Sequence, residues 1–121
     1  MATTIKKTVE HTQEGCMGRV LAVKDALEVL SGRWKLPIIL SVSFGTKRFK
    51  QISKELNGIT DKVLSKELKE LEANQLIKRT VYDAFPPMVE YSITEHGRTL
   101  EKVITELGHW GASHRKKIIG R

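Results

Sequence analysis

Residues 48–94 read RFKQISKELNGITDKVLSKELKELEANQLIKRTVYDAFPPMVEYSIT, and this stretch decides the fold. Its first part carries apolar side chains at the spacing of one helical face, at Phe49, Ile52 and Leu56. Gly58 follows closely, and glycine tolerates the left-handed backbone that is common just past the end of a helix. The pattern therefore predicts a short helix that ends in a tight turn.

A second helix is predicted over residues 61–73. Thr60 is its candidate N-cap, because a threonine hydroxyl accepts a hydrogen bond from a first-turn amide. Asp61 places a carboxylate at the positive end of the helix dipole. The buried stripe is predicted to be Leu64, Leu68 and Leu71. The opposite face is rich in lysine, which suits an anionic partner.

A β-hairpin is predicted after the second helix. Residues 77–82 and 88–93 both fit a period of two, which is typical of strands. The segment 83–87 between them ends in two prolines, which cannot donate ladder hydrogen bonds and therefore mark the turn. Two helices, a turn and a hairpin in this order are typical of a winged helix-turn-helix. We expect an α+β fold that is mostly helical.

The composition suits one modest domain with a polyanionic partner. The chain has 121 residues, a net charge of +7 and a pI near 9.7, which favours nucleic acid. No apolar run approaches the ~18 residues of a membrane span, and a lone cysteine forms no internal disulfide, so we expect a cytoplasmic protein. We predict a mobile N-terminal arm over residues 1–15, the winged-helix domain over 16–114 and a basic tail over 115–121.

Further helices are predicted on both sides of the winged helix. Residues 34–44 are apolar nearly all round and should form the buried central helix, and a last helix should run from Thr94 to about His114. The first and last helices need a cover, either the same helices of a second copy or their own domain. The predicted dimer interface comprises Val20, Val23, Leu27, Leu30, Leu100, Val103, Ile104, Leu107, Trp110 and Gly111.

These residues carry a resemblance to a known family. The matching pattern is Cys16, Gly32-Arg33-Trp34, Arg48-Phe49, Ile52, Gly58-Ile59-Thr60, Leu64, Leu68, Leu71-Glu72, Leu76-Ile77, Arg79, the wing segment 86–94, Gly97, Leu100 and Trp110. The chain resembles the HxlR family of winged helix-turn-helix bacterial transcriptional regulators, which are related to the MarR group. It departs from the family at Met17, where proline is frequent, and at Gln75, where glycine is frequent.

The resemblance implies a homodimer that binds a pseudo-palindromic operator in double-stranded DNA, as a repressor or an activator. It also implies control by an electrophile or oxidant through a cysteine near the N-terminus, and Cys16 occupies that place beside the basic Arg19 and Lys24. Two alternatives remain open. Cys16 can instead be an inert packing residue, since free cysteine is commonly buried. A small-molecule effector can act in place of a thiol switch.

The DNA contacts are predicted on the second helix, on the helix before it and at the base of the wing. The set is Lys47, Arg48, Lys50, Lys54, Thr60, Asp61, Lys62, Ser65, Lys66, Lys69, Lys78 and Arg79. Ser65 and Lys66 are the candidates for base edges, and the other basic residues suit phosphates. Arg48 has an alternative role as a helix-start residue paired with an internal carboxylate.

Other classes of function find less support in the sequence. The four histidines, His11, His96, His109 and His114, lack metal-ligand spacing, so we expect no metal and no cofactor. No nucleophile with an orienting group is visible, so we do not expect an enzyme. A winged helix that binds protein or RNA remains the main alternative, although such modules often lose the basic helix face that this chain keeps.

Overall fold

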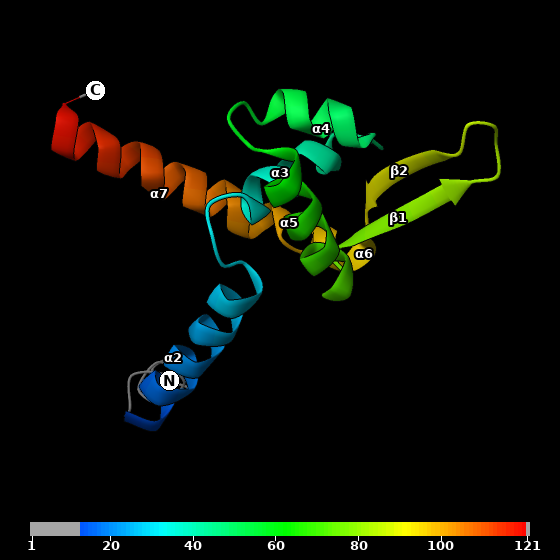
Figure 1. Ribbon diagram of the computed structural model, residues 1–121. Coiled ribbons are helices and arrows are strands. Elements are labelled where there is room, and N and C mark those ends of the chain that lie inside the picture. Colours follow the sequence, from blue (N-terminus) through cyan, green and yellow to red (C-terminus); the bar gives the residue numbers. More distant parts are fainter. Residues whose placement is uncertain (1–12, 121) are drawn as a thin grey trace. The chain divides into compact units, whose positions relative to one another are not determined.

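The computed structural model describes residues 13–120, and it contains the predicted helix-turn-helix and hairpin (Figure 1). Its elements in chain order are α2 (Gln13–Val29), α3 (Lys35–Ser43), α4 (Phe49–Glu55), α5 (Asp61–Ala73), β1 (Ile77–Tyr82), β2 (Met88–Ile93), α6 (Glu95–Arg98) and α7 (Glu101–Ile119). The fold is mostly helical with a two-stranded wing, as predicted. Residues Gly32–Arg121 form one compact unit, and α2 belongs to a separate unit.

The core of the compact unit lies between α3, α4, α5 and the base of the hairpin. The three leucines predicted to form the buried stripe of α5 are all buried. Leu76 and Ile77, which follow α5, are buried as well. The main buried side chains are Ile38, Ile39, Val42, Ile52, Ile59, Leu64, Leu68, Leu71, Leu76, Ile77 and Tyr91. Burial of this stripe fixes which face of α5 remains on the surface.

The turn between α4 and α5 forms as the sequence predicts. Gly58 has φ of +99°, a backbone conformation that side chains with a Cβ rarely adopt. Thr60 caps α5, since its hydroxyl oxygen accepts a hydrogen bond from the amide of Val63 at 3.2 Å. Asp61 lies in the first turn of α5, where a carboxylate favours the helix dipole.

The other end of α5 closes with a left-handed residue that is not glycine. Gln75 has φ of +60°, so it adopts the backbone that glycine would favour at this point. The amide of Leu76 then donates to the carbonyl of Leu71 at 3.0 Å, which closes the helix. The departure from the family's glycine therefore leaves the left-handed turn in place, at the cost of a strained backbone at Gln75.

The hairpin pairs β1 with β2 in antiparallel register, from Ile77 opposite Ile93 to Tyr82 opposite Met88. Only its base is covered, because Ile77 is buried while the outer residues of β1 are exposed. A feature that the sequence did not suggest adds to the sheet. Lys47 pairs with Tyr91 through two backbone hydrogen bonds, so the chain before α4 continues the sheet beside β2.

The central helix α3 has one exposed apolar residue and one buried charged residue, neither of which the sequence predicts. Leu40 is exposed, whereas Lys35 is buried. The Lys35 ammonium lies 2.7 Å from a carboxylate oxygen of Glu67 and 2.7 Å from one of Glu70. The prediction of a buried central helix is therefore confirmed for most of α3, with Leu40 as an exposed exception, and one edge of the helix meets carboxylates of α5 that balance a buried charge.

The predicted single helix from Thr94 to about His114 is two helices. Thr94 caps the short α6, as its hydroxyl accepts from the amide of Gly97 at 2.9 Å. Thr99 and Leu100 then form a turn in which amides bond to carbonyls three residues back, and this turn separates α6 from α7. Helix α7 continues to Ile119, so most of the predicted tail, residues 115–121, is helical.

The N-terminal helix also begins earlier than predicted. Helix α2 starts at Gln13, so residues 13–15 of the predicted arm are helical, and Cys16 lies inside the helix. The rest of that arm, with His11, lies outside the described residues, as does Arg121 at the other end. The predicted boundary at residue 16 therefore falls within α2.

Candidate nucleic-acid interface

The exposed face of α5 is basic. The side chains of Lys62, Lys66 and Lys69 are exposed, and Ser65 between them is half-buried. They lie on this face because the leucine stripe of the same helix faces the core. Three ammonium groups within about two helical turns give this surface a positive potential that suits phosphate groups.

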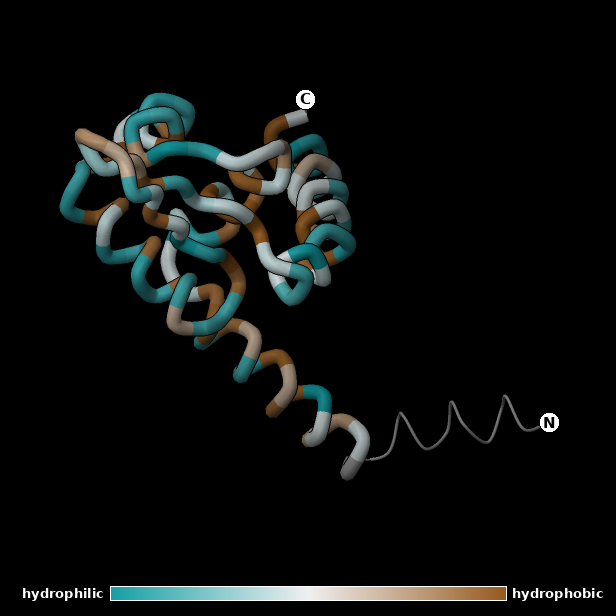
Figure 2. The backbone as a smooth tube through the Cα atoms, turned by 90° about the vertical axis from the view of Figure 1, so that its right-hand side faces the viewer, coloured by the Kyte–Doolittle hydropathy of each residue, from teal (hydrophilic) through white to brown (hydrophobic). Residues whose placement is uncertain are grey.

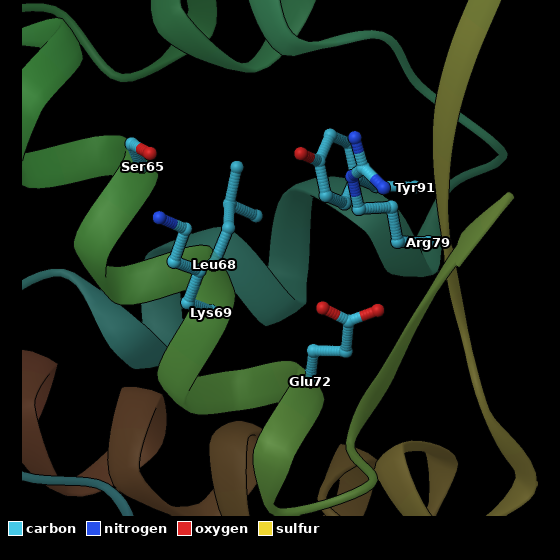
Figure 3. Close-up of a pocket in the computed structure, with 6 residues that line it drawn as sticks. All are labelled: Ser65, Leu68, Lys69, Glu72, Arg79 and Tyr91. Carbon is cyan, nitrogen blue, oxygen red and sulfur yellow. The ribbon is translucent and has the colours of Figure 1, made fainter. Parts of the chain in front are cut away.

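A groove of about 380 Å³ separates α5 from the hairpin. It is lined by Ser65, Leu68, Lys69, Glu72, Arg79 and Tyr91, and Figure 3 shows the residues of α5 facing Arg79 and Tyr91. The groove thus joins Lys69 of the helix to Arg79 of the wing. A chain of phosphates that follows it would meet cations from both elements, and also the carboxylate of Glu72.

Two residues of the groove were missed by the sequence reasoning. Glu72 and Tyr91 were noted only as parts of the family pattern, and no motif marked them as surface contacts. Tyr91 stands directly opposite Arg79 in the hairpin register, which places both at the groove. The register was the available signal, since residues paired across two strands project to the same face of the sheet.

The predicted basic residues around α4 do not all remain available for a partner. Lys50 and Lys54 are exposed, as expected of phosphate contacts. Lys47 instead forms an ion pair with Glu55 and is half-buried. The hydrogen bond from Lys47, together with one from Ser41, lowers the pKa of Glu55 below its ordinary value. The charge of Lys47 is therefore largely balanced within the protein.

Arg48 and Lys78 occupy different surroundings from those expected. The guanidinium of Arg48 lies against the sulfur of Met88 on the wing, and among residues 13–120 it has no carboxylate partner. Arg48 is nevertheless the helix-start residue of the alternative, since it is the N-cap of α4 and its amide donates to the side-chain oxygen of Gln51 at 2.8 Å, whereas the internal carboxylate of that alternative is not found. Lys78 does not line the groove between α5 and the hairpin, but it lines a neighbouring shallow pocket with Thr94 and His96, and Arg79 lines both.

The ion-pair cluster under α5 holds the basic face in place. Burial alone would lower the pKa of Lys35, but its hydrogen bonds to Glu67 and Glu70 outweigh burial, and the pKa is raised. The hydrogen bond from Lys35 also lowers the pKa of Glu70 below its ordinary value. Both shifts favour the charged forms of these groups, so α5 is tied to α3 by ionic bonds at neutral pH.

The residues predicted to form a dimer interface are mostly on the surface of the chain. Within α2, Val20, Val23 and Leu27 are each more than half exposed. Within α7, Leu107 and Trp110 are also exposed, and the helix buries none of its residues. Figure 2 shows apolar and polar residues alternating along α2. The remaining members are Leu30, Leu100 and Ile104, which are half-buried, and Val103 and Gly111, which are exposed.

Cys16 is a free, exposed thiol on α2, with Arg19 one helical turn further along the chain. Cys16 is therefore not buried within its own chain, while its reactivity stays a prediction. Among residues 13–120, no group of three or more histidine, cysteine, aspartate or glutamate side chains is arranged to hold a metal ion. None of the helices in the same range is long and apolar enough to cross a membrane.

The comparisons with known proteins agree with this architecture. A family model described as HxlR-like helix-turn-helix matches residues 29–118. The chain is 40% identical over 100 residues to the uncharacterized HTH-type transcriptional regulator YtcD of Bacillus subtilis, covering 83% of this chain and 79% of that protein.

Two solved structures are also similar over most of the chain. The redox regulator HypR in its reduced form has a TM-score of 0.77 and 38% identity, with 83% of this chain and 99% of that chain covered. The reduced form of the transcriptional regulator YodB from B. subtilis has a TM-score of 0.66 and 38% identity, with 72% of this chain and 85% of that chain covered.

Proposed function

Since the chain belongs to the HxlR-like helix-turn-helix family of transcriptional regulators, we propose that it binds a specific operator as a homodimer. Helix α5 would lie in the major groove, with the wing beside it. The observation that carries the proposal is the exposed lysine face of α5, which continues through the groove to Arg79. A winged helix that served only protein contacts would have no need of cations on this face.

Affinity and specificity would come from different residues. Lys62 and Lys69 carry ammonium groups that bind phosphates as point charges and read no sequence. Ser65 and Lys66 lie between them and are the candidates for contacts to base edges. Among the remaining members of the set, Lys50, Lys54 and Arg79 would bind the flanking phosphates, while Thr60 and Asp61 would place the start of α5 against the duplex.

Two copies of the chain would set the length of the operator. The exposed apolar side chains of α2 and α7 supply the surface for a second copy, because a two-fold interface pairs the same surface of both subunits. Such a dimer presents two copies of α5 to successive major grooves, so the half-sites should be about 34–36 Å apart. A pseudo-palindromic sequence follows from this symmetry.

Salt dependence tests the DNA-binding part of the proposal. If the dimer neutralises about 6–10 phosphates, affinity for the selected duplex should fall about 10³–10⁵-fold between 50 and 200 mM salt. Lys69→Ala should weaken binding to all sequences and lower the salt slope by about one for each cation lost from a phosphate. Lys102→Ala, an exposed lysine of α7, is the matched control and should leave the slope unchanged. Absence of binding to any duplex, with binding to RNA or a protein instead, would contradict the proposal.

The dimer requires its own test. Leu107→Asp places a carboxylate among the exposed apolar residues of α7 and should produce monomers in light scattering, because an unpaired charge is costly to bury. Glu106→Gln, one position away and also exposed, is the control and should remain dimeric. A monomeric wild-type protein at micromolar concentration would overturn this part.

Control of the regulator by oxidation of Cys16 is the finer proposal. The thiol is exposed on α2, within the proposed dimer helix, and two of the similar structures are regulators whose reduced forms were solved. Two electrons and two protons would pass from two thiols to an oxidant such as diamide, leaving a disulfide. Since the described residues contain one cysteine, the second sulfur would come from Cys16 of the partner subunit or from a small thiol.

The test compares operator binding before and after diamide in wild type and in Cys16→Ser. Release of wild type, reversed by a reducing agent and absent in the variant, is expected. If diamide leaves wild-type binding unchanged, or releases the variant equally well, oxidation of Cys16 is not the switch. A non-covalent small-molecule effector would then take its place.

A further inference from the structure

The tip of the wing is apolar, in contrast to its base. Phe85 is 102% exposed, so its whole ring stands in solvent. Val81 and Tyr82 below it are also exposed, and residues 81–87 contain no lysine or arginine. The basic residues of the hairpin, Lys78 and Arg79, lie at its base. The tip therefore has no cation with which to bind a phosphate.

The ring is held at a defined place at the end of the hairpin. Six residue pairs join β1 to β2 up to Tyr82 opposite Met88, and the segment 83–87 closes the end. Pro86 and Pro87 follow Phe85 directly and fix two backbone φ angles. Single exposed apolar residues are common on protein surfaces. Phe85 differs from such residues because the hairpin that carries it begins at the groove lined by Lys69 and Arg79.

The length of the wing matches the spacing of the grooves in DNA. A strand of six residues at about 3.3 Å each extends about 20 Å, and half a turn of the duplex is about 17 Å. Figure 1 shows the hairpin projecting away from α4 and α5. With α5 in a major groove, a projection of this length is long enough to reach the adjacent minor groove.

We propose that Phe85 is an apolar wedge that enters the minor groove beside each half-site and partly unstacks a base step there. The inference rests on the proposed DNA binding and adds a contact that the lysines cannot make. Asp83 carries a negative charge at the tip, which the phosphates on both sides of the minor groove repel, so insertion of the ring has to outweigh this repulsion. Phenylalanine is one of the side chains that minor-groove proteins insert between bases, and the insertion kinks the duplex.

The wedge makes a prediction about sequence preference. Pyrimidine–purine steps such as TA and CA unstack most easily, so they cost least to open. The operator should therefore prefer such a step where the tip meets it, outside the base pairs that α5 contacts. This preference depends on deformation of the DNA and not on hydrogen bonds, so it should disappear with the ring.

The experiment uses the full chain and a duplex selected by the wild-type protein from random sequences. Four proteins are compared, namely wild type, Phe85→Ala, Phe85→Leu and Phe44→Ala. Phe44 is 81% exposed but follows α3, far from the wing in sequence, and it controls for the loss of an exposed phenylalanine. The measurements are the dissociation constant, its salt slope, the bend angle by end-to-end energy transfer, and the fluorescence of 2-aminopurine at the flanking step.

Phe85→Ala should bind about tenfold more weakly, by analogy with the loss of one base–aromatic contact, with reduced bending and no 2-aminopurine signal. Its salt slope should equal that of wild type, since no phosphate contact is lost. Phe85→Leu should retain most of the bend, and Phe44→Ala all of it.

Three results would overturn the wedge while leaving DNA binding intact. The first is an unchanged bend and affinity in Phe85→Ala. The second is a reduced salt slope in that variant, which would mean that the tip positions phosphate contacts. The third is unchanged DNA binding with lost control of transcription in a purified system, which would make the tip a contact for another protein. Failure of the wild type to select any duplex would instead refute the proposed function itself.

Discussion

Replacing Lys35 with alanine should destabilise the protein strongly, although lysine is rarely a stabilising core residue. The Lys35 side chain is 5% exposed, and it is bonded at 2.7 Å to Glu67, whose side chain is 10% exposed. Lys35→Ala removes the cation and leaves the Glu67 carboxylate buried without it. Glu70, the second partner, is 43% exposed and can turn towards water. The loss of stability therefore comes mainly from the Glu67 carboxylate, which stays buried without its cation.

The magnitude follows from that burial. Removing one partner of a buried ion pair typically costs about 3–5 kcal/mol. In a domain of roughly 100 residues, each kcal/mol corresponds to about 4–8 °C in the melting temperature, so the melting temperature should fall by about 12 °C or more. Removing both charges should cost much less, because an apolar pair of similar volume can replace a buried ion pair at little net cost.

Circular dichroism during heating and denaturant unfolding, at one protein concentration, would measure these effects. Fixed concentration matters because a dimer's stability depends on it. Lys102→Ala is the surface control and should change stability by less than about 0.5 kcal/mol. The double variant Lys35→Met/Glu67→Leu should recover most of the loss. A Lys35→Ala variant within about 1 kcal/mol of wild type, or a double variant as unstable as the single one, would refute the reasoning.

Three further predictions follow from backbone and charge. Gln75→Gly should raise stability by about 1 kcal/mol, seen as a higher denaturant midpoint, because a residue with a Cβ is strained at φ of +60° and glycine is not. Gly97→Ala should lower stability by about 2 kcal/mol or more, since its Cβ would lie 2.2 Å from the carbonyl oxygen of Leu76. Gly108→Ala is the control and should leave stability unchanged or raise it, because a Cβ at that position meets nothing within 4 Å. Stability should fall in acid, below about pH 4.5, because Glu70, whose pKa is lowered in the folded protein, then takes up a proton. Stability should also fall above pH 10.5, because Lys35, whose pKa is raised, then loses its proton. Unfolding curves measured over a series of pH values would check both effects.

Much of the helix-turn-helix could be predicted because its signals are local. The bounds of α5 agree with the predicted 61–73, and Thr60 is its cap, since the threonine and the leucine stripe act over single turns. The strands agree as well, at 77–82 and 88–93, because two prolines leave few places for the turn. Interactions that span one or two turns were thus within reach of the sequence.

The features that could not be predicted depend on partners far away in the chain. Lys35 lies 32 residues before Glu67, and a lysine beside an apolar helix is expected on the surface until its partner is known. Lys47 was assigned to phosphates although Glu55, only eight residues further on, takes up its charge; this pair joins the segment before α4 to the end of that helix, a contact that helical periodicity does not predict. The break between α6 and α7 was hidden because the apolar pattern runs on across it.

Part of the candidate interface could be predicted from the sequence, and part of it could not. The exposed lysines of α5 follow from helical periodicity, since the buried stripe determines the opposite face. The groove with Glu72 and Tyr91 follows only from the hairpin register and its approach to α5. The sequence places Phe85 in the predicted turn 83–87, but full exposure of its ring is seen only in the structure, because apolar residues are generally expected to be buried.

The turn at Thr99 and Leu100 lies at the start of the long helix α7, so any bending there would move the far end of that helix. The helix has 19 residues and is therefore about 28 Å long, so a rotation of about 10° at this turn moves its far end by about 5 Å. On the other side of the turn, the hydroxyl of Thr94 donates to the carbonyl of Gln75 at 2.6 Å, at the end of α5. A small displacement of α5 that reached this turn through the hydrogen bond would therefore be enlarged at the far end of α7.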